Sequence, residues 1–191
     1  MSWVRCHCSI YLHMLIGRLT FVRHDRQCMS TPAETAFLLD LMLGKLATYL
    51  RMCGYDTAYA LDRGIEDDSK LRELASGEGR TLLTRDTDLV RQTDGAVLLR
   101  GRAIETQLSE LMENGFELEL DEPARCSACN GPLRGVPPRE STPSFSPSPT
   151  EQAVWRCCAC GQLFWKGSHW WDVETTLAGL ETGPTETYRC A

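Results

Sequence analysis

Two kinds of hydrophobic pattern alternate along residues 34–122. Short apolar runs of strand length are followed by stretches in which apolar residues recur every three or four positions, the spacing of one helix face. Leu43, Leu46 and Leu50 show the helical spacing most clearly. Strands that alternate with helices of this length predict an α/β fold, a parallel-sheet sandwich built from right-handed crossovers. The strand-like runs lie at residues 36–39, 56–61, 80–84, 96–99 and 116–120, and the helix-like stretches lie at 43–53, 67–78, 86–92 and 104–114.

The pattern changes at Pro123, where turn residues and cysteines replace the alternation. We therefore predict a second, smaller unit over residues 123–172. Within it, residues 139–152 are rich in serine and proline and poor in apolar residues, which predicts a mobile loop. Residues 1–33 lack a clear periodicity, so we expect an unstructured leader or a wrongly assigned start there. Residues 173–191 are expected to form a polar tail.

Four of the ten cysteines are spaced as ligands of one metal ion. Each of two Cys-x-x-Cys pairs can place two thiolates about 2.3 Å from a zinc ion, and four thiolates complete a tetrahedral structural site with no open position for water. The alternative is two buried cysteine pairs without metal. However, so small a segment has little apolar core of its own, and zinc binding can supply its folding free energy. The predicted zinc ligands are Cys126, Cys129, Cys157 and Cys160.

A second candidate metal site, Cys6, His7 and Cys8, is weaker. These residues are adjacent in the sequence and have no distant partner pair, which makes a poor tetrahedral site.

Aromatic and basic side chains stand beside the second cysteine pair. Lys166, His169 and Trp170 combine positive charge with aromatic rings, the mixture that contacts phosphates and stacks bases in RNA-binding proteins. Trp155, Trp165 and Trp171 belong to the same region. The alternative is that some of these tryptophans cover the small unit and pack it against the α/β unit. The sequence leaves both interpretations open.

Acidic residues stand where the predicted strands end. Asp40 closes the first strand, and Asp67 and Asp68 open the second helical stretch. Asp86 and Asp88 follow the third strand. Each of them can be a helix N-cap, a position that favours aspartate. Because the carboxyl ends of parallel strands share one sheet edge, the acids are also expected to meet there.

Carboxylates that meet in this way repel one another unless a cation lies among them. Ligands that are all oxygen atoms select Mg²⁺ or Mn²⁺, and such a site suits the attack of water on a phosphodiester. The sequence therefore predicts a Mg²⁺ or Mn²⁺ site at this edge, formed by at least three of these carboxylates.

The composition narrows the classes of partner. Hydrophobic residues make up 42% of the 191 residues and charged residues 24%, which is typical of a globular protein. A net charge of −6 argues against a protein that coats nucleic acid through bulk positive charge, so any contact with RNA has to be local. No apolar stretch approaches the roughly 20 residues that a membrane span needs, and no signal-peptide cleavage pattern is evident. We expect a cytoplasmic protein with no membrane contact.

Taken in order, these motifs resemble the Mut-seven C-terminal RNase domain family. The resemblance covers residues 36–172 and is carried by FLLDLMLGKLATYLRMCGYD at 37–56, LLTRD at 82–86, the two cysteine pairs and FWKGSHW at 164–170. The chain departs from the family pattern in its leader, in the Ser/Pro-rich insertion and at Phe164, where tyrosine is expected. The resemblance implies a PIN-like nuclease fold with a C-terminal zinc ribbon, and a metal-dependent ribonuclease activity.

The resemblance also implies roles for single residues. Asp40 takes the place of the first-strand acid, and Asp68 or Asp67 that of the middle acid. Asp86 and Asp88 would be the acids after the third strand. Thr84 and Arg85 would support that last turn. Three basic residues are candidates to bind RNA: Lys45, Arg51 and Arg85.

Two hypotheses of different classes follow. The first is a Mg²⁺- or Mn²⁺-dependent endoribonuclease whose zinc ribbon helps to bind RNA. In it, Asp40, Asp68 and Asp86 would hold one or two ions, and Asp88 would complete or position the ligand shell. The second is a non-catalytic RNA- or protein-binding adaptor that makes its contacts through the ribbon. A phosphotransferase that uses Asp86 and Asp88 as paired aspartates fits less well, because Thr84 and Arg85 separate the pair from its strand.

Overall fold

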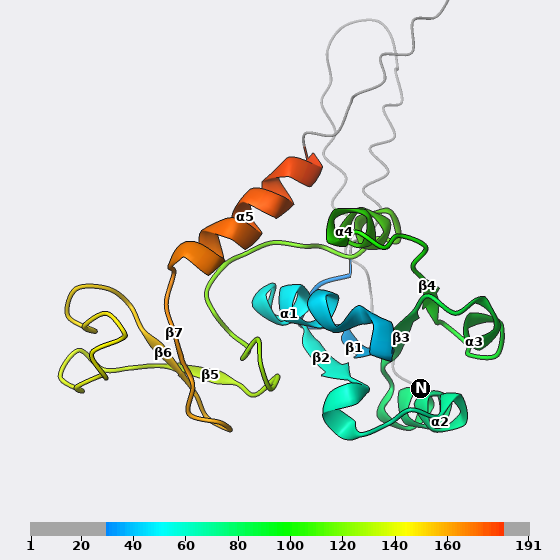
Figure 1. The fold of residues 1–191 in the computed structure, drawn as a ribbon, viewed down its shortest axis with the longest axis horizontal. Coiled ribbons are helices and arrows are strands. Elements are labelled where there is room, and N and C mark those ends of the chain that lie inside the picture. The colour runs from blue at the N-terminus through cyan, green and yellow to red at the C-terminus, as the bar shows by residue number, and fades with distance from the viewer. Residues whose placement is uncertain (1–29, 182–191) are drawn as a thin grey trace, which may run out of the picture.

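The computed structural model of the chain describes residues 30–181, and its centre is a sheet of four parallel strands (Figure 1). The strand order is β2-β1-β3-β4, so β1 lies between β2 and β3 and pairs with both. The strands are β1 (Ala36–Leu39), β2 (Asp56–Tyr59), β3 (Thr81–Thr84) and β4 (Val97–Leu98). The predicted α/β fold with a parallel sheet is confirmed.

Helices cover both faces of this sheet. Because successive strand residues point to opposite faces, Phe37 and Leu39 enter one core while Leu38 enters the other. The first core is shared with α1 (Gly44–Met52), α4 (Ile104–Glu113) and α5 (Ser168–Glu181). The second is shared with α2 (Asp68–Glu78) and α3 (Thr87–Arg91). We call the sheet with α1 to α4 the α/β unit.

Two short 3₁₀ helices follow the carboxyl ends of strands: η1 (Leu41–Leu43) before α1, and η2 (Leu61–Arg63) before α2. The Tyr59 hydroxyl donates a hydrogen bond to the carbonyl oxygen of Leu41 at 2.7 Å. A Cβ atom at Gly44 would lie 2.9 Å from that hydroxyl oxygen. Glycine at position 44 therefore lets η1 and α1 lie against β2, and this fixes the turn that contains Asp40.

The cysteine-rich segment forms a second, antiparallel sheet in the order β5-β6-β7. Its strands are β5 (Leu133–Gly135), β6 (Trp155–Cys157) and β7 (Leu163–Phe164), and we call residues 123–167 the ribbon. The predicted loop at 139–152 contains no helix or strand. Its ends are held by a 2.6 Å ion pair between Glu140 and Arg156, and by a 2.8 Å hydrogen bond from the Gln152 side chain to the Lys166 carbonyl oxygen.

One predicted strand is absent from the described part of the chain. In residues 116–120, only Phe116 pairs, in an isolated parallel bridge with Ser30. Phe116 and Leu118 are nevertheless buried in the core, while Glu119 is exposed. The alternation of apolar and polar residues at 116–120 therefore correctly predicted which side chains are buried, but it did not predict that this segment stays outside the sheet.

The prediction of a polar tail is wrong for residues 173–181, which form the second half of α5. Figure 1 shows α5 leading from the ribbon back toward α4. Val173 and Leu177, four positions apart on one helix face, are buried in the first core. Residues 1–29 and 182–191 lie outside the described range, and with them most of the predicted leader and the Cys6, His7 and Cys8 candidate. None of the described helices is long and apolar enough to span a bilayer.

Candidate active site and metal centre

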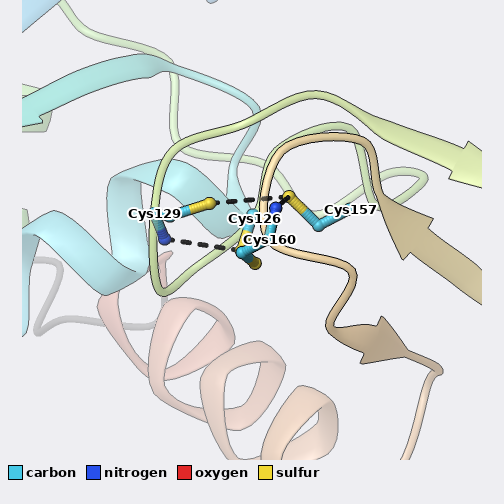
Figure 2. Close-up of side chains that lie close together, drawn as sticks. All are labelled: Cys126, Cys129, Cys157 and Cys160. Carbon is cyan, nitrogen blue, oxygen red and sulfur yellow. Dashed lines mark hydrogen bonds between the residues drawn. The ribbon is translucent and has the colours of Figure 1, made fainter.

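The four predicted zinc ligands converge on one point of the ribbon (Figure 2). Their sulfur atoms all lie within 4.8 Å of one another. Two of the sulfur–sulfur distances are 3.5 Å, between Cys129 and Cys157, and 3.7 Å, between Cys126 and Cys160. Two thiolates bound to one zinc ion at the tetrahedral angle are about 3.8 Å apart, whereas a disulfide bond is about 2.05 Å long. The cluster can therefore hold one metal ion.

Each pair sits on a tight turn with the same local design, which we call a knuckle. In the first knuckle the Cys126 N–H donates to the Gly131 carbonyl oxygen at 2.8 Å, and in the second the Cys157 N–H donates to the Gln162 carbonyl oxygen at 2.9 Å. The residue after each second cysteine is left-handed: Asn130 has φ +65° and Gly161 has φ +77°. These turns aim both thiols of a pair inward.

Gly131 is needed for the close approach of the two knuckles. A Cβ atom at this position would lie 2.9 Å from the Cys157 sulfur and 2.8 Å from the Ala159 Cβ atom. Any larger residue there would push the second knuckle away from the first.

The thiols of the cluster differ in acidity before any metal binds. Burial raises the pKa of the Cys126 thiol to about 12. Burial also acts on Cys157, but the backbone N–H groups of Cys160 and Ala159 donate to its sulfur and lower its pKa to about 7. Metal binding requires thiolates, so occupancy of this site releases protons and strengthens as the pH rises.

The first knuckle is docked on the α/β unit by Arg51, the last basic residue of α1. The Arg51 guanidinium donates to the carbonyl oxygens of Ser127 at 3.2 Å and Ala128 at 3.0 Å. It also donates to the Thr57 carbonyl oxygen and pairs with Asp62 at 2.8 Å. With its side chain only 4% exposed, Arg51 is occupied by these contacts. The structure thus contradicts the prediction that Arg51 binds RNA phosphate.

Asn130 makes the reciprocal contact from the knuckle to the edge strand β2. Its side-chain oxygen accepts from the Thr57 N–H at 3.0 Å, and its side-chain nitrogen donates to Asp56 at 2.7 Å. Asp56 in turn pairs with Arg80 at 2.8 Å and with Arg125 at 3.4 Å. The knuckle therefore satisfies an N–H of an edge strand that would otherwise be unpaired.

The acidic edge, which we define as Asp40, Asp67, Asp68, Asp86 and Asp88, follows the carboxyl ends of the strands. Asp40 comes directly after β1, and Asp86 comes two residues after β3. The Thr84 hydroxyl donates to Asp40 at 2.7 Å and accepts from the Asp86 N–H at 3.0 Å. Thr84 therefore ties together the two turns that carry Asp40 and Asp86.

Helix capping explains part of this arrangement. Asp40, Asp67 and Asp86 are the N-caps of η1, α2 and α3, and each accepts at least one backbone N–H. Asp86 accepts two, from Asp88 at 2.7 Å and Leu89 at 3.0 Å. The capping alternative is thus correct for these three residues. A carboxylate offers about four lone-pair positions, so a capping residue keeps some of them for other ligands.

The remaining acids are less constrained. Asp68 is the exposed first residue of α2, and exposed Asp88 pairs with Arg91 at 2.9 Å, one turn further along α3. Within residues 30–181, the cysteine cluster is the only group of three or more Cys, His, Asp or Glu ligand atoms that all lie within 4.8 Å of one another. The acids thus lie at the same end of the sheet without forming so tight a group.

The other candidates for binding RNA fall into two places. Lys45 is exposed at the start of α1, five residues after Asp40 and directly after Gly44, with its ammonium nitrogen 5.9 Å from the Tyr49 ring centre. Half-buried Arg85 lies between Thr84 and Asp86. On the ribbon side, the Lys166 ammonium lies 4.8 Å from the Trp170 ring centre.

Packing explains some of the tryptophans. Trp170 is 5% exposed and so is mainly a packing residue, whereas His169 next to it is exposed. Trp155 and Trp165 are half-buried, and Trp171 is 50% exposed.

Sequence reasoning missed the docking residues Asn130, Asp56 and Asp62. The available signal was local: Asn130 directly follows a Cys-x-x-Cys pair, where a left-handed residue is required and asparagine is one of the few alternatives to glycine.

Comparison with known proteins gives one match. The family model described as the Mut7-C RNAse domain matches residues 35–177, about three quarters of the chain. Searches of curated proteins and of solved structures each gave no match.

Proposed function

Because the chain belongs to the Mut7-C RNAse domain family, we propose that it is an endoribonuclease that hydrolyses RNA phosphodiester bonds with Mg²⁺ or Mn²⁺. The observation that carries the proposal is the link from Asp40 through the Thr84 hydroxyl to Asp86. It ties together the two turns that carry these acids at the ends of neighbouring parallel strands, the edge at which open α/β sheets bind their ligands.

The donor set suits a hard divalent cation. Asp40, Asp68 and Asp86 would hold the ion or ions, since all three offer carboxylate oxygen atoms and the latter two are exposed. Such ions, when bound, lower the pKa of a water molecule and neutralise charge on the departing oxygen.

The protein's own groups orient these acids. The Thr84 hydroxyl fixes one oxygen of Asp40, and two backbone N–H groups of α3 fix one oxygen of Asp86. Lys45, exposed next to the Asp40 turn, is placed to contact an RNA phosphate. We further propose that the four-cysteine cluster binds zinc as a structural ion, because four thiolates leave no open position for catalysis.

The test compares single Asp→Asn variants, which remove a charge with almost no change of shape. Removing a residue that only supports a metal ligand costs up to about 100-fold in activity. Asp40 and Asp86 are proposed as direct ligands, so Asp40→Asn and Asp86→Asn are each expected to lower the cleavage rate by more than that. The matched control is Asp94→Asn, an exposed acid before β4 at the opposite edge of the sheet, which should cleave normally. Full activity of an Asp40→Asn, Asp86→Asn double variant would refute the proposal.

The alternative function is a non-catalytic adaptor that binds RNA or a protein through the ribbon. It is favoured by the capping roles of Asp40, Asp67 and Asp86, which account for these residues without a metal. Binding of RNA that is unaffected by loss of the acids, with no cleavage by the unaltered chain, would select this alternative.

A further inference from the structure

A pocket lies where the ribbon meets the α/β unit and the start of α5. Its volume is about 210 Å³, which is below the roughly 300–1,000 Å³ of pockets for drug-sized ligands and suits a single planar ring system. It is lined by Met52 at the end of α1, by Ser127 of the first knuckle, and by Phe164, Trp165 and His169 of the FWKGSHW stretch. The pocket is separate from the acidic edge, because no residue of that edge lines it.

The lining combines flat apolar surface with free polar groups. Half-buried Phe164 and Trp165 supply rings on which a base can stack, and Met52 adds a flexible apolar wall. Within residues 30–181, the side chains of Ser127 and His169 make no hydrogen bond to another protein group, so they are available to the edge of a ligand. Arg125 also lines the pocket, and Lys166 lies over the Trp170 ring nearby.

Charge favours a nucleic-acid ligand on this side of the molecule. Counting only Asp, Glu, Lys and Arg, residues 34–122 carry ten basic and 19 acidic residues, a net charge of −9. Residues 123–172 carry five basic and three acidic residues, a net charge of +2. A polyanion therefore meets less repulsion at residues 123–172 than at residues 34–122 taken as a whole.

One face of α1 connects the pocket to the acidic edge. Lys45, Thr48 and Met52 recur at intervals of three and four residues, so they lie along the same side of the helix. The helix starts four residues after Asp40 and ends at Met52, a rise of about 12 Å from Gly44. An RNA strand whose phosphate meets Lys45 would pass along this face before it reaches the pocket.

We propose that this pocket binds one unpaired nucleobase of a single-stranded RNA, a few nucleotides from the phosphodiester that is cut at the acidic edge. This inference rests on the proposed ribonuclease function, because that function is the reason for taking RNA as the ligand. It makes the substrate class single-stranded RNA, since a base inside a duplex cannot enter the pocket without leaving its stack. It also gives the ribbon a direct part in setting where the cut falls.

The test uses the full-length chain carrying Asp40→Asn, without Mg²⁺ or Mn²⁺, so that binding is measured without cleavage. The probe is a short single-stranded oligoribonucleotide with one fluorescent 2-aminopurine, moved through each position in turn. Stacking in the pocket should quench the probe at one position. Replacing that nucleotide by an abasic one should weaken binding about 5- to 150-fold, the usual effect of losing one base–aromatic stack.

Three further variants locate the effect. Phe164→Ala and His169→Ala are expected to abolish the quenching, and Phe145→Ala is the matched control, an aromatic residue that is 73% exposed on the Ser/Pro-rich loop. His169 is exposed, so its variant retains the fold, and bound zinc checks that the ribbon of the Phe164 variant is intact.

The outcomes separate this inference from the proposed function. If the unaltered chain cleaves RNA but no probe position is quenched, or abasic RNA binds equally well, the base-binding pocket is refuted and the proposed ribonuclease function is not. Quenching that depends on Phe164 and His169, without cleavage by the unaltered chain, supports the pocket and overturns the nuclease. A chain that neither binds nor cuts RNA overturns both.

Discussion

The cysteine cluster and the acidic edge both bring together side chains from distant parts of the sequence that can act as metal ligands, but they are organised differently. The four thiols lie within 4.8 Å of one another because each pair is fixed by a knuckle of its own. The acids come from separate turns, and most of them are held by the helices that they cap. The cysteine cluster is thus arranged to hold one metal ion as it stands, whereas the acidic edge consists of exposed or capping carboxylates that do not form so tight a group.

The difference extends to what each region contributes to stability. Among the described residues, the buried apolar clusters of the sheet include Val173 and Leu177 of α5 but no residue of the ribbon. The ribbon has strands of only two or three residues. With the zinc ion that we propose, a segment so small would draw its folding free energy from metal binding, while the α/β unit draws its own from its core.

The largest expected effect comes from removing a ligand of the cysteine cluster. Cys126→Ser should abolish zinc binding and unfold the ribbon, because about 10–16 kcal/mol of binding free energy supports sites of this kind. The matched control is Cys158→Ser, since Cys158 is exposed and lies outside the cluster. Zinc content is measured by mass spectrometry, and amide exchange should increase in the knuckles while β1 and β3 stay protected. Loss of protection across the whole sheet would show that the two regions fold as one.

A smaller effect is expected at the contact between the two regions. Arg51→Ala removes the donor for the carbonyl oxygens of Thr57, Ser127 and Ala128. Leaving such groups without a charged donor should lower the free energy of unfolding by about 2–4 kcal/mol. Arg63→Ala, which breaks only a surface ion pair with Glu78, should cost less than about 1 kcal/mol. Urea unfolding of the two variants measures the difference, and equal losses would contradict the docking role of Arg51.

The smallest effect concerns pH and Asp56. Partial burial would raise the pKa of this carboxyl, but hydrogen bonds from Arg80 and Asn130 outweigh it and hold the pKa below its ordinary value of 3.8. A group with a lowered pKa contributes stability above its unfolded-state pKa and loses it as the pH falls through the folded-state value. Asp56→Asn should therefore lower the free energy of unfolding by about 1 kcal/mol at pH 7, with a difference that shrinks steadily below about pH 4. A difference that does not change with pH would contradict this account.

The sequence predicted the individual residues of the cysteine cluster more fully than the geometry of the acidic edge, because cysteine and aspartate differ in how many structural roles they can take. Paired cysteines have few uses in so small a unit, so Cys126, Cys129, Cys157 and Cys160 could be assigned one by one. Aspartate at a strand end serves equally as cap or ligand, so the sequence located the acidic edge without its geometry.

Longer-range contacts left still weaker signals. Arg51 looked like a surface cation in the helical pattern, and only the approach of the first knuckle, 76 residues away, shows that it is buried. Residues 173–181 of α5 have a mostly polar composition, and two apolar residues, Val173 and Leu177, are too few to show a helical pattern. The sequence therefore did not predict this part of the helix. Lys166, His169 and Trp170 of the FWKGSHW stretch were candidates to bind RNA, with packing as the alternative. The pocket beside them also needs Met52 and Ser127, which no local pattern connects to the stretch.

The most direct test of the central claim is cleavage of a labelled, mixed-sequence single-stranded RNA by the purified chain with Mn²⁺, with Mg²⁺ and with no added divalent ion. Zinc content is measured in each sample, so that the ribbon is known to be folded. The account predicts cutting that requires added Mg²⁺ or Mn²⁺ and disappears in Asp40→Asn. A folded, zinc-loaded chain that cuts under none of these conditions, or that cuts equally well without added ions, would contradict it.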